Sequence, residues 1–140
     1  MIVVREMTKQ DVPKLRKIYL ETRIKTFEWI DPKNFELADF DKDTEEEIIL
    51  VAESNGSPVG FISLYAPDSF IHCLFVDWAW KGTGVGHLLL EEAKGYLPLP
   101  LKLKCVSKNT SALAFYKKEG WKLVDEVTDT ENYWNLVYGE

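Results

Sequence analysis

The segment from residue 74 to residue 90 constrains the fold of this 140-residue chain more than any other part. An apolar run at 74–76 predicts a buried strand, and the helical spacing of apolar residues after residue 84 predicts a helix. Between the two lie Gly82, Gly84 and Gly86, which let the backbone adopt positive φ and approach a ligand closely. The start of the following helix carries unpaired N–H groups, so this bend is suited to bind an anion such as a phosphate.

Two common phosphate-binding motifs are excluded at this bend. A P-loop requires Gly-Lys followed by Ser or Thr, and the chain contains no such sequence. The dinucleotide fingerprint requires a third glycine three residues after the second, and His87 and Leu89 stand at the two positions that would need it. The residues alone therefore leave two interpretations open, an anion-binding bend with Lys81 beside it and a purely structural glycine-rich turn.

The remaining patterns predict one domain over residues 1–140, without repeats or linkers. A first helix begins after Thr8, and Asn55-Gly56 is typical of a tight β-hairpin. Further helices are expected at about 34–40, from Gly84 until Pro98 ends it, and from Asn109 to Gly120. Strands are expected at 2–5, 48–52, 59–64, 70–77, 101–105, 121–127 and 133–138. The order β-α-α-β-β-β-α-β-α-β-β indicates an α+β or mixed α/β domain.

The charge balance limits the classes of partner. The chain has 17 basic and 23 acidic residues, a net charge of −6 and a pI near 5.0. Nucleic acids and anionic membranes are therefore disfavoured as main partners, and no apolar stretch approaches the roughly 18 residues of a membrane span. Cys73 and Cys105 lie in apolar segments, which is typical of buried thiols in a reducing compartment. With no signal-peptide pattern and no metal-ligand cluster, we expect a cytoplasmic protein without a metal.

Two segments resemble one known family. The bend at 81–86 and the preceding 74–77 resemble the acyl-CoA loop and fourth strand of the GNAT N-acetyltransferase superfamily, whose loop pattern is Gln/Arg-x-x-Gly-x-Gly/Ala. Residues 109–121 are similar to that family's Asn-x-x-Ala-x-x-Phe-Tyr-x-x-x-Gly-Phe signature. The order of elements agrees along all 140 residues. Lys81, Trp78 and Trp121 depart from the usual residues, and we regard these changes as tolerable because main-chain amides hold most of the pyrophosphate.

The resemblance implies a mixed, mostly antiparallel sheet flanked by helices, and transfer of the acetyl group of acetyl-CoA to a primary amine by direct attack in a ternary complex. It places a carbonyl-polarising backbone N–H near 74–76, the pyrophosphate at 82–87, and the pantetheine arm against Asn109 and Phe115. The cofactor-binding residues expected on this basis are Leu74, Phe75, Val76, Lys81, Gly82, Thr83, Gly84, Val85, Gly86, His87, Asn109 and Phe115.

Two side chains are expected to move protons. Tyr116 matches the family's general acid, and a phenol with a pKa near 10 can protonate a thiolate leaving group. His72 is the first candidate for the base, because it lies two residues before Leu74 and should face the same side of the strand. Glu28, Asp68 or a chain of water molecules are the alternatives.

The acceptor is the least constrained part of the prediction. The family builds its acceptor site from the first helices, the loop after them and the last strands, which here suggests Phe27, Glu28, Trp29 and Tyr65. These acidic and aromatic residues favour a cationic amine with an apolar portion, on a small molecule or a peptide. Homodimers are frequent among relatives. A non-catalytic module that senses coenzyme A, and an enzyme for a longer acyl-CoA, remain the alternatives.

Overall fold

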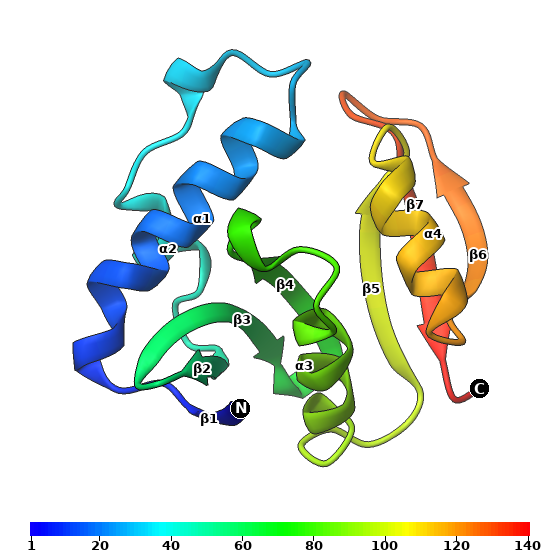
Figure 1. Cartoon of the computed structure of the whole chain (residues 1–140). Helices are drawn as coiled ribbons and strands as arrows, with labels where there is room; N and C mark the ends of the chain where they lie inside the picture. The colour runs from blue at the N-terminus through cyan, green and yellow to red at the C-terminus, as the bar shows by residue number, and fades with distance from the viewer.

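The computed structural model describes all residues from 1 to 140 and contains seven strands and four α-helices (Figure 1). Short 3-10 turns lie at Lys9–Asp11, Pro32–Asn34, Ala66–Asp68 and Trp78–Trp80. The strands are β1 (Ile2–Glu6), β2 (Ile48–Ser54), β3 (Ser57–Tyr65), β4 (Phe70–Val76), β5 (Leu101–Val106), β6 (Lys122–Val127) and β7 (Tyr133–Tyr138). The helices are α1 (Val12–Thr26), α2 (Asp39–Asp43), α3 (Val85–Ala93) and α4 (Thr110–Lys118).

The seven strands form one sheet in the order β1-β2-β3-β4-β5-β7-β6. Every neighbouring pair is antiparallel except β4 and β5, which are parallel. The turn between β2 and β3 has positive φ at Asn55 (51°) and Gly56 (82°), as the expected tight hairpin requires. The predicted mixed, mostly antiparallel sheet flanked by helices is confirmed.

The parallel contact between β4 and β5 is very short. Only Phe70 and Ile71 pair with Lys102 and Leu103, after which the two strands diverge (Figure 1). The end of β4 from Leu74 to Val76 therefore bonds to β3 on one side and has no strand partner on the other. This unpaired edge in the middle of the sheet is the feature that positions the site.

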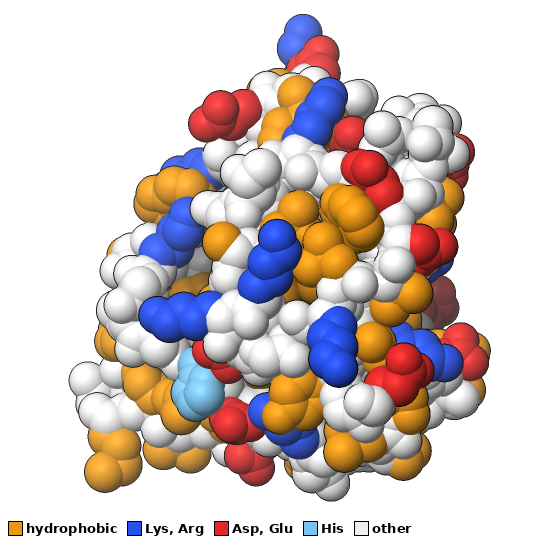
Figure 2. All heavy atoms as spheres, turned by 90° about the vertical axis from the view of Figure 1, so that its right-hand side faces the viewer, with side chains coloured by type: hydrophobic (Ala, Val, Ile, Leu, Met, Phe, Trp, Pro, Cys, Tyr) orange, Lys and Arg blue, Asp and Glu red, His pale blue; other side chains and the backbone are white.

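The helices cover the two faces of the sheet. Alternate residues of β2 enter different clusters: Leu50 packs with α3 and α4, whereas Val51 packs with α1 and α2. The α3/α4 cluster contains 18 buried residues and the α1/α2 cluster contains 8, so the larger core lies beneath α3 and α4. The face that carries α4 and β6 presents basic and acidic side chains around exposed hydrophobic ones (Figure 2).

Two predicted helices differ from the structure. The helix expected at 34–40 is wrong: a 3-10 turn occupies Pro32–Asn34, and α2 begins only at Asp39, where Phe40 is buried against Tyr19 and Phe61. Tertiary packing of Phe40 therefore decides where this helix forms. The third helix ends at Ala93, well before Pro98. Leu88 is 40% exposed, although the helical spacing of apolar residues after residue 84 predicts it on the buried face of this helix.

The first helix begins as expected. The Asp11 carboxylate accepts a hydrogen bond of 2.8 Å from the Thr8 backbone N–H, and Arg5 donates two further bonds to the same carboxylate. The start of α1 is thereby joined to strand β1.

None of the helices combines the length and the apolar character that crossing a bilayer would require.

Candidate active site

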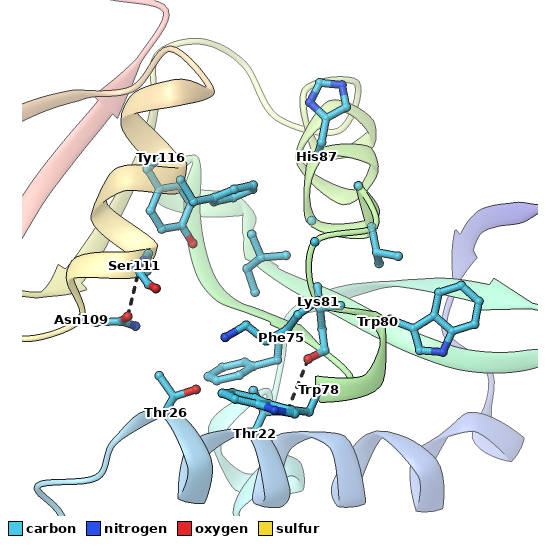
Figure 3. A pocket seen from close by; sticks show the side chains of 18 residues that line it. Thr22, Thr26, Phe75, Trp78, Trp80, Lys81, His87, Asn109, Ser111 and Tyr116 are labelled. Atoms are coloured by element: carbon cyan, nitrogen blue, oxygen red, sulfur yellow. Dashed lines mark hydrogen bonds between the residues drawn. The ribbon is translucent and has the colours of Figure 1, made fainter.

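A pocket lies where β4 and β5 diverge, and segments from four parts of the chain line it (Figure 3). All but one of the expected cofactor-binding residues line this pocket. The exception is Thr83, whose hydroxyl donates a hydrogen bond to the Trp80 carbonyl. Sequence reasoning did not include Thr22, Thr26, Trp78, Trp80, Ser111 and Ala112, which also line the pocket. Thr22 and Thr26 are spaced by four residues on α1, but nothing in that spacing identifies a ligand.

The glycine-rich bend has the backbone that the sequence predicted. Gly82 and Gly84 have φ of 74° and 90°, and no atom lies within 4 Å of the Cβ position of either residue. Gly84 is the N-cap of α3, so the free N–H groups of the first turn follow directly after it. The bend thus presents main-chain donors together with the positive end of the α3 dipole, which is a suitable environment for a diphosphate.

Gly86 differs from Gly82 and Gly84 because it is the small size of the residue that matters, and its φ is not positive. A Cβ atom on Gly86 would lie 3.1 Å from Cζ of Phe115, so the missing side chain lets α3 and α4 approach across the pocket. Phe115 in turn packs edge-on against Tyr116, with ring centroids 5.3 Å apart. The wall of the pocket on the α4 side is therefore aromatic and close to the start of α3.

Local contacts hold the Lys81 and His87 side chains near the bend. Lys81 Nζ lies 3.8 Å from the centre of the Trp78 ring, a cation–π contact that keeps the ammonium beside the bend. His87 Nδ1 lies 2.6 Å from Glu119 Oε1, which ties the first turn of α3 to the end of α4. The net charge of this acidic chain does not prevent a locally favourable site for an anion.

Asn109 is an N-cap as well as a pocket residue. Its Oδ1 accepts a hydrogen bond of 3.3 Å from the Ala112 backbone N–H, which fixes the start of α4 (Figure 3). The side chain amide N–H₂ group remains the part of Asn109 that a ligand could bond.

Tyr116 lies on α4 with its hydroxyl directed toward the pocket (Figure 3). The residue is only 9% exposed, and its ring packs on Trp121 at 5.9 Å between centroids. Burial raises the pKa of Tyr116 above its ordinary value near 10, and the neighbouring Cys105 and Cys73 thiols raise it further. The phenol therefore keeps its proton at neutral pH, as a proton donor must.

His72 does not face the side of β4 that the sequence predicted. Ser63 pairs with Cys73 but Leu64 pairs with Ile71, so His72 is the extra residue of a β-bulge. The bulge breaks the alternation on which the prediction rested: Leu74 packs with the α3/α4 core, while His72 lies beside Phe70, with ring centroids 6.5 Å apart. His72 lines a second groove instead of the pocket.

The second groove has a volume of about 720 Å³ and lies along the paired part of β4 and β5. It contains the carboxylates of Glu47, Asp68, Asp125 and Glu140, together with Lys102 and Lys104. Within it, His72 Nδ1 lies 2.8 Å from Glu47 Oε2. The adjoining Cys73 side chain and the charge of Glu47 raise the pKa of His72 to about 9, so the unperturbed value near 6.5 does not apply.

The expected acceptor residues are divided between two places. Tyr65 lines the second groove, together with Asp68, one of the alternative bases. Phe27 and Trp29 form an aromatic cluster in the connection after α1, with ring centroids 5.6 Å apart, and this cluster lines neither cavity. Glu28 is exposed in the same connection. The structure thus brings only Tyr65 and Asp68 close to His72.

Comparison with known proteins decides the family. The model of the acetyltransferase (GNAT) family matches residues 12–121, which is most of the chain. The chain belongs to the GNAT acetyltransferase family. The resemblance inferred from the glycine bend and the 109–121 signature is confirmed.

Individual GNAT relatives agree in fold. Over 99 residues the chain is 31% identical to the peptidyl-lysine N-acetyltransferase YjaB of Salmonella typhimurium. This match covers 67% of the chain and 66% of the relative, slightly less than two thirds of its length. The solution structure of the apo form of YjaB from Escherichia coli has a TM-score of 0.80 at 26% identity, over 99% of this chain and 97% of that one.

A third relative contains a ligand. The PaiA N-acetyltransferase of Thermoplasma acidophilum was solved in complex with coenzyme A. It has a TM-score of 0.82 at 19% identity, and the match covers 97% of this chain and 98% of that one. The shared GNAT fold, with coenzyme A in such a relative, agrees with the cofactor expected from the sequence.

Proposed function

We propose that the chain transfers the acetyl group of acetyl-CoA to a primary amine, and specifically to a lysine side chain of a peptide or protein. The observation that carries this proposal is the unpaired edge of β4 at Leu74–Val76, which lies between the glycine bend and Tyr116 in one pocket. Membership of the GNAT family and the similarity to a peptidyl-lysine acetyltransferase support the reaction and the acceptor class.

The pocket offers a suitable group for each part of the donor. The amides from Gly82 to His87 and the ammonium of Lys81 suit the pyrophosphate. The free edge of β4 offers backbone groups to the amides of the pantetheine arm, in the manner of an added strand. A backbone N–H of the same edge then polarises the thioester carbonyl, because it points into the gap between the strands.

Proton transfers complete the reaction. The acceptor ammonium loses a proton to His72, and its nitrogen attacks the carbonyl carbon of the thioester. The C–S bond breaks, and Tyr116 donates its proton to the departing thiolate. Tyr116 lies in the pocket, and His72 lines the separate second groove beyond the bulge in β4. This assignment therefore requires the acceptor amine to reach the thioester from the side of β4 that carries the groove. Asp68 lines the same groove and is the alternative base, whereas Glu28 lines neither cavity.

The second groove is the proposed entrance for the acceptor. Tyr65 and Phe70 give it aromatic side chains, and its four carboxylates outnumber its two lysines. A lysine side chain has an apolar stem and a terminal cation, which suits this combination. The buried thiols of Cys73 and Cys105 accord with a cytoplasmic location, which stays part of the proposal.

The direct test measures binding and turnover separately. Calorimetry with coenzyme A should show one site per chain, and acetyl-CoA with lysine-containing peptides should release free thiol together with acetylated peptide. Binding without thiol release from any amine would favour the coenzyme A sensor. Release only from longer acyl-CoA donors would favour the other acyltransferase. Absence of binding at millimolar coenzyme A would reject the proposal.

A further inference from the structure

Glu47 is a buried carboxylate of which only one oxygen has a partner in the chain. Its side chain is 8% exposed, and Oε2 lies 2.8 Å from His72 Nδ1. Its other oxygen, Oε1, is buried and has no hydrogen-bond partner in the chain. Leaving a buried polar atom unpaired is destabilising, and more so when the group is charged. The fold therefore keeps Glu47 in this place at a cost, with His72 as its side-chain partner.

The backbone before Glu47 is also strained. Glu46 has φ of 64°, a left-handed conformation that a residue with a Cβ atom adopts at a cost. This conformation lies between the Thr44–Glu47 turn, where the Glu47 N–H donates to the Thr44 carbonyl, and the start of β2. Strain and an unsatisfied buried oxygen at adjacent residues indicate that something other than stability determines the position of the carboxylate.

We propose that Glu47 is a positioning residue for the proton-accepting His72, a role that rests on the function proposed above. Glu47 Oε2 accepts the Nδ1–H of His72, which selects the tautomer with its lone pair on Nε2. The bulge in β4 also contributes to the position of His72. It breaks the alternation of side chains along the strand, so His72 lines the groove. The acceptor ammonium gives its proton to Nε2, and Glu47 stabilises the resulting imidazolium.

The charges around His72 support this role. Cys73 adjoins it on β4, and Tyr65 and Asp68 lie in the groove from the β3 side. Lys102 and Lys104 line the groove from β5, and the carboxylates of Asp125 on β6 and Glu140 line it as well. The adjoining Cys73 side chain makes the largest contribution to the raised pKa of His72, about 9, and the charge of Glu47 adds to it. A base of this pKa takes a proton from a lysine ammonium, with an ordinary pKa near 10.4, more readily than an unperturbed imidazole does.

The experiment uses the fact that the chain has only two histidines. Imidazole titrations by NMR on the wild-type chain and on Glu47→Gln report the tautomer and pKa of His72 without requiring activity. We expect the Nδ1–H tautomer and a midpoint near pH 9 in the wild type. In Glu47→Gln the midpoint should fall by about one unit, which is a tenfold change in proton affinity. The control is Glu119→Gln, because Glu119 is the carboxylate that contacts the other histidine, His87. This substitution should leave the His72 titration unchanged.

Kinetics then connect the titration to the reaction. For the wild type, kcat/KM should rise with pH up to about 9, because only unprotonated His72 accepts a proton. In Glu47→Gln this midpoint should move down with the NMR midpoint and the plateau should fall by about tenfold. The KM for acetyl-CoA should not change, and Glu47→Asp should recover part of both effects.

Two outcomes would overturn the inference. An unchanged His72 titration in Glu47→Gln would show that the carboxylate does not act on the imidazole. A shifted titration with an unchanged pH–rate profile would show that His72 is not the proton acceptor. Failure of the proposed acetyltransferase activity can be told apart from failure of this inference. A chain without acetyltransferase activity would still show the shift of the His72 titration in Glu47→Gln.

Discussion

Gly86 shows how one absent side chain shapes the pocket. Its Cβ position lies 3.1 Å from Phe115 Cζ, so a side chain at residue 86 would push Phe115 away from the start of α3. Tyr116 follows Phe115 in sequence and packs against it, so the same contact sets the place of the proposed acid. Single residues at the α3–α4 contact therefore control both the shape of the pocket and the geometry of its chemistry.

Removing the Tyr116 hydroxyl tests the proposed acid. Tyr116→Phe keeps the ring that packs on Trp121 but removes the proton donor, so kcat should fall by about 100-fold while the Kd for coenzyme A changes little. Steady-state kinetics and calorimetry measure the two quantities. The matched control is Tyr96→Phe, at an exposed tyrosine outside the pocket. Wild-type turnover in Tyr116→Phe would remove the residue from the mechanism.

Asp11 gives a pH dependence of stability. Hydrogen bonds from Arg5, followed by one from Thr8, hold the pKa of Asp11 below its ordinary 3.8. Because the folded pKa is lowered, the stabilisation is complete above the unfolded pKa and is lost as pH falls through the folded one. Asp11→Asn should lose about 1–3 kcal/mol in urea unfolding at pH 7.

The difference between Asp11→Asn and the wild type should shrink as the pH falls below about 4, where the wild-type carboxyl takes up a proton. Asp41→Asn is the control, because its pair with Arg16 is exposed and solvent weakens it. Equal effects of the two substitutions at pH 7 would contradict the special role of the buried carboxylate.

At the scale of elements, the site depends on how α3 begins and on how β4 is interrupted. Gly84 ends the bend in a left-handed conformation and begins the helix, so the amide donors of the first turn point toward the pocket. The bulge at His72 separates the part of β4 that lines the pocket from the part that lines the groove. Residues of β4 thus line both cavities, because the bulge interrupts the alternation of side chains between the two faces of the sheet.

Gly84→Ala tests the strained start of α3. With φ at 90° and open space around the Cβ position, the cost is conformational and should be about 1–2 kcal/mol in urea unfolding. Coenzyme A should also bind more weakly, because relaxation of the bend would turn amides away from the pocket. Gly95→Ala, where φ is not positive and the new Cβ would make an ordinary 3.5 Å contact, should unfold like the wild type. Equal losses in both variants would contradict a role for the left-handed conformation.

At the scale of the whole molecule, the sheet has two parts that share only two residue pairs between β4 and β5. Beyond the open end of this gap, Trp29 Nε1 donates a hydrogen bond of 2.7 Å to Glu131 Oε1, and Lys108 lies 5.5 Å from the Trp29 ring centre. The connection after α1 and the turn between β6 and β7 face each other there (Figure 1). The Trp29–Glu131 contact therefore joins the two parts at the side opposite to their strand pairing.

Removing this bridge should loosen one connection without unfolding the chain. In Glu131→Ala, hydrogen exchange of the amides at 27–35 should become faster, while exchange in β2 and β3 should stay as in the wild type. Glu45→Ala, at an exposed carboxylate in another part of the chain, is the control. Unchanged exchange at 27–35 in Glu131→Ala would show that other contacts hold the connection.

Local chemistry in the sequence was sufficient for most of the elements and for the glycine bend. The Asn55-Gly56 turn, the strand at 101–105 and the helix that begins after Asn109 each depend on interactions within a few residues, and each is found as expected. For the same reason most of the residues that line the pocket could be named from two contiguous segments. Those residues lie together because the strand, bend and helix that carry them are consecutive.

The tertiary structure alone decided the side of β4 that His72 faces, the position of α2 and the partnership with Glu47. A bulge depends on the register with β3, and the place of α2 depends on where Phe40 packs, so neither follows from periodicity along one segment. Glu47 and His72 are 25 residues apart in sequence and meet only because β2 and β4 flank β3 in the sheet. Contacts between distant segments carry no local signature, which is why the sequence predicted the binding bend and the fold determined the arrangement of the proposed proton acceptor.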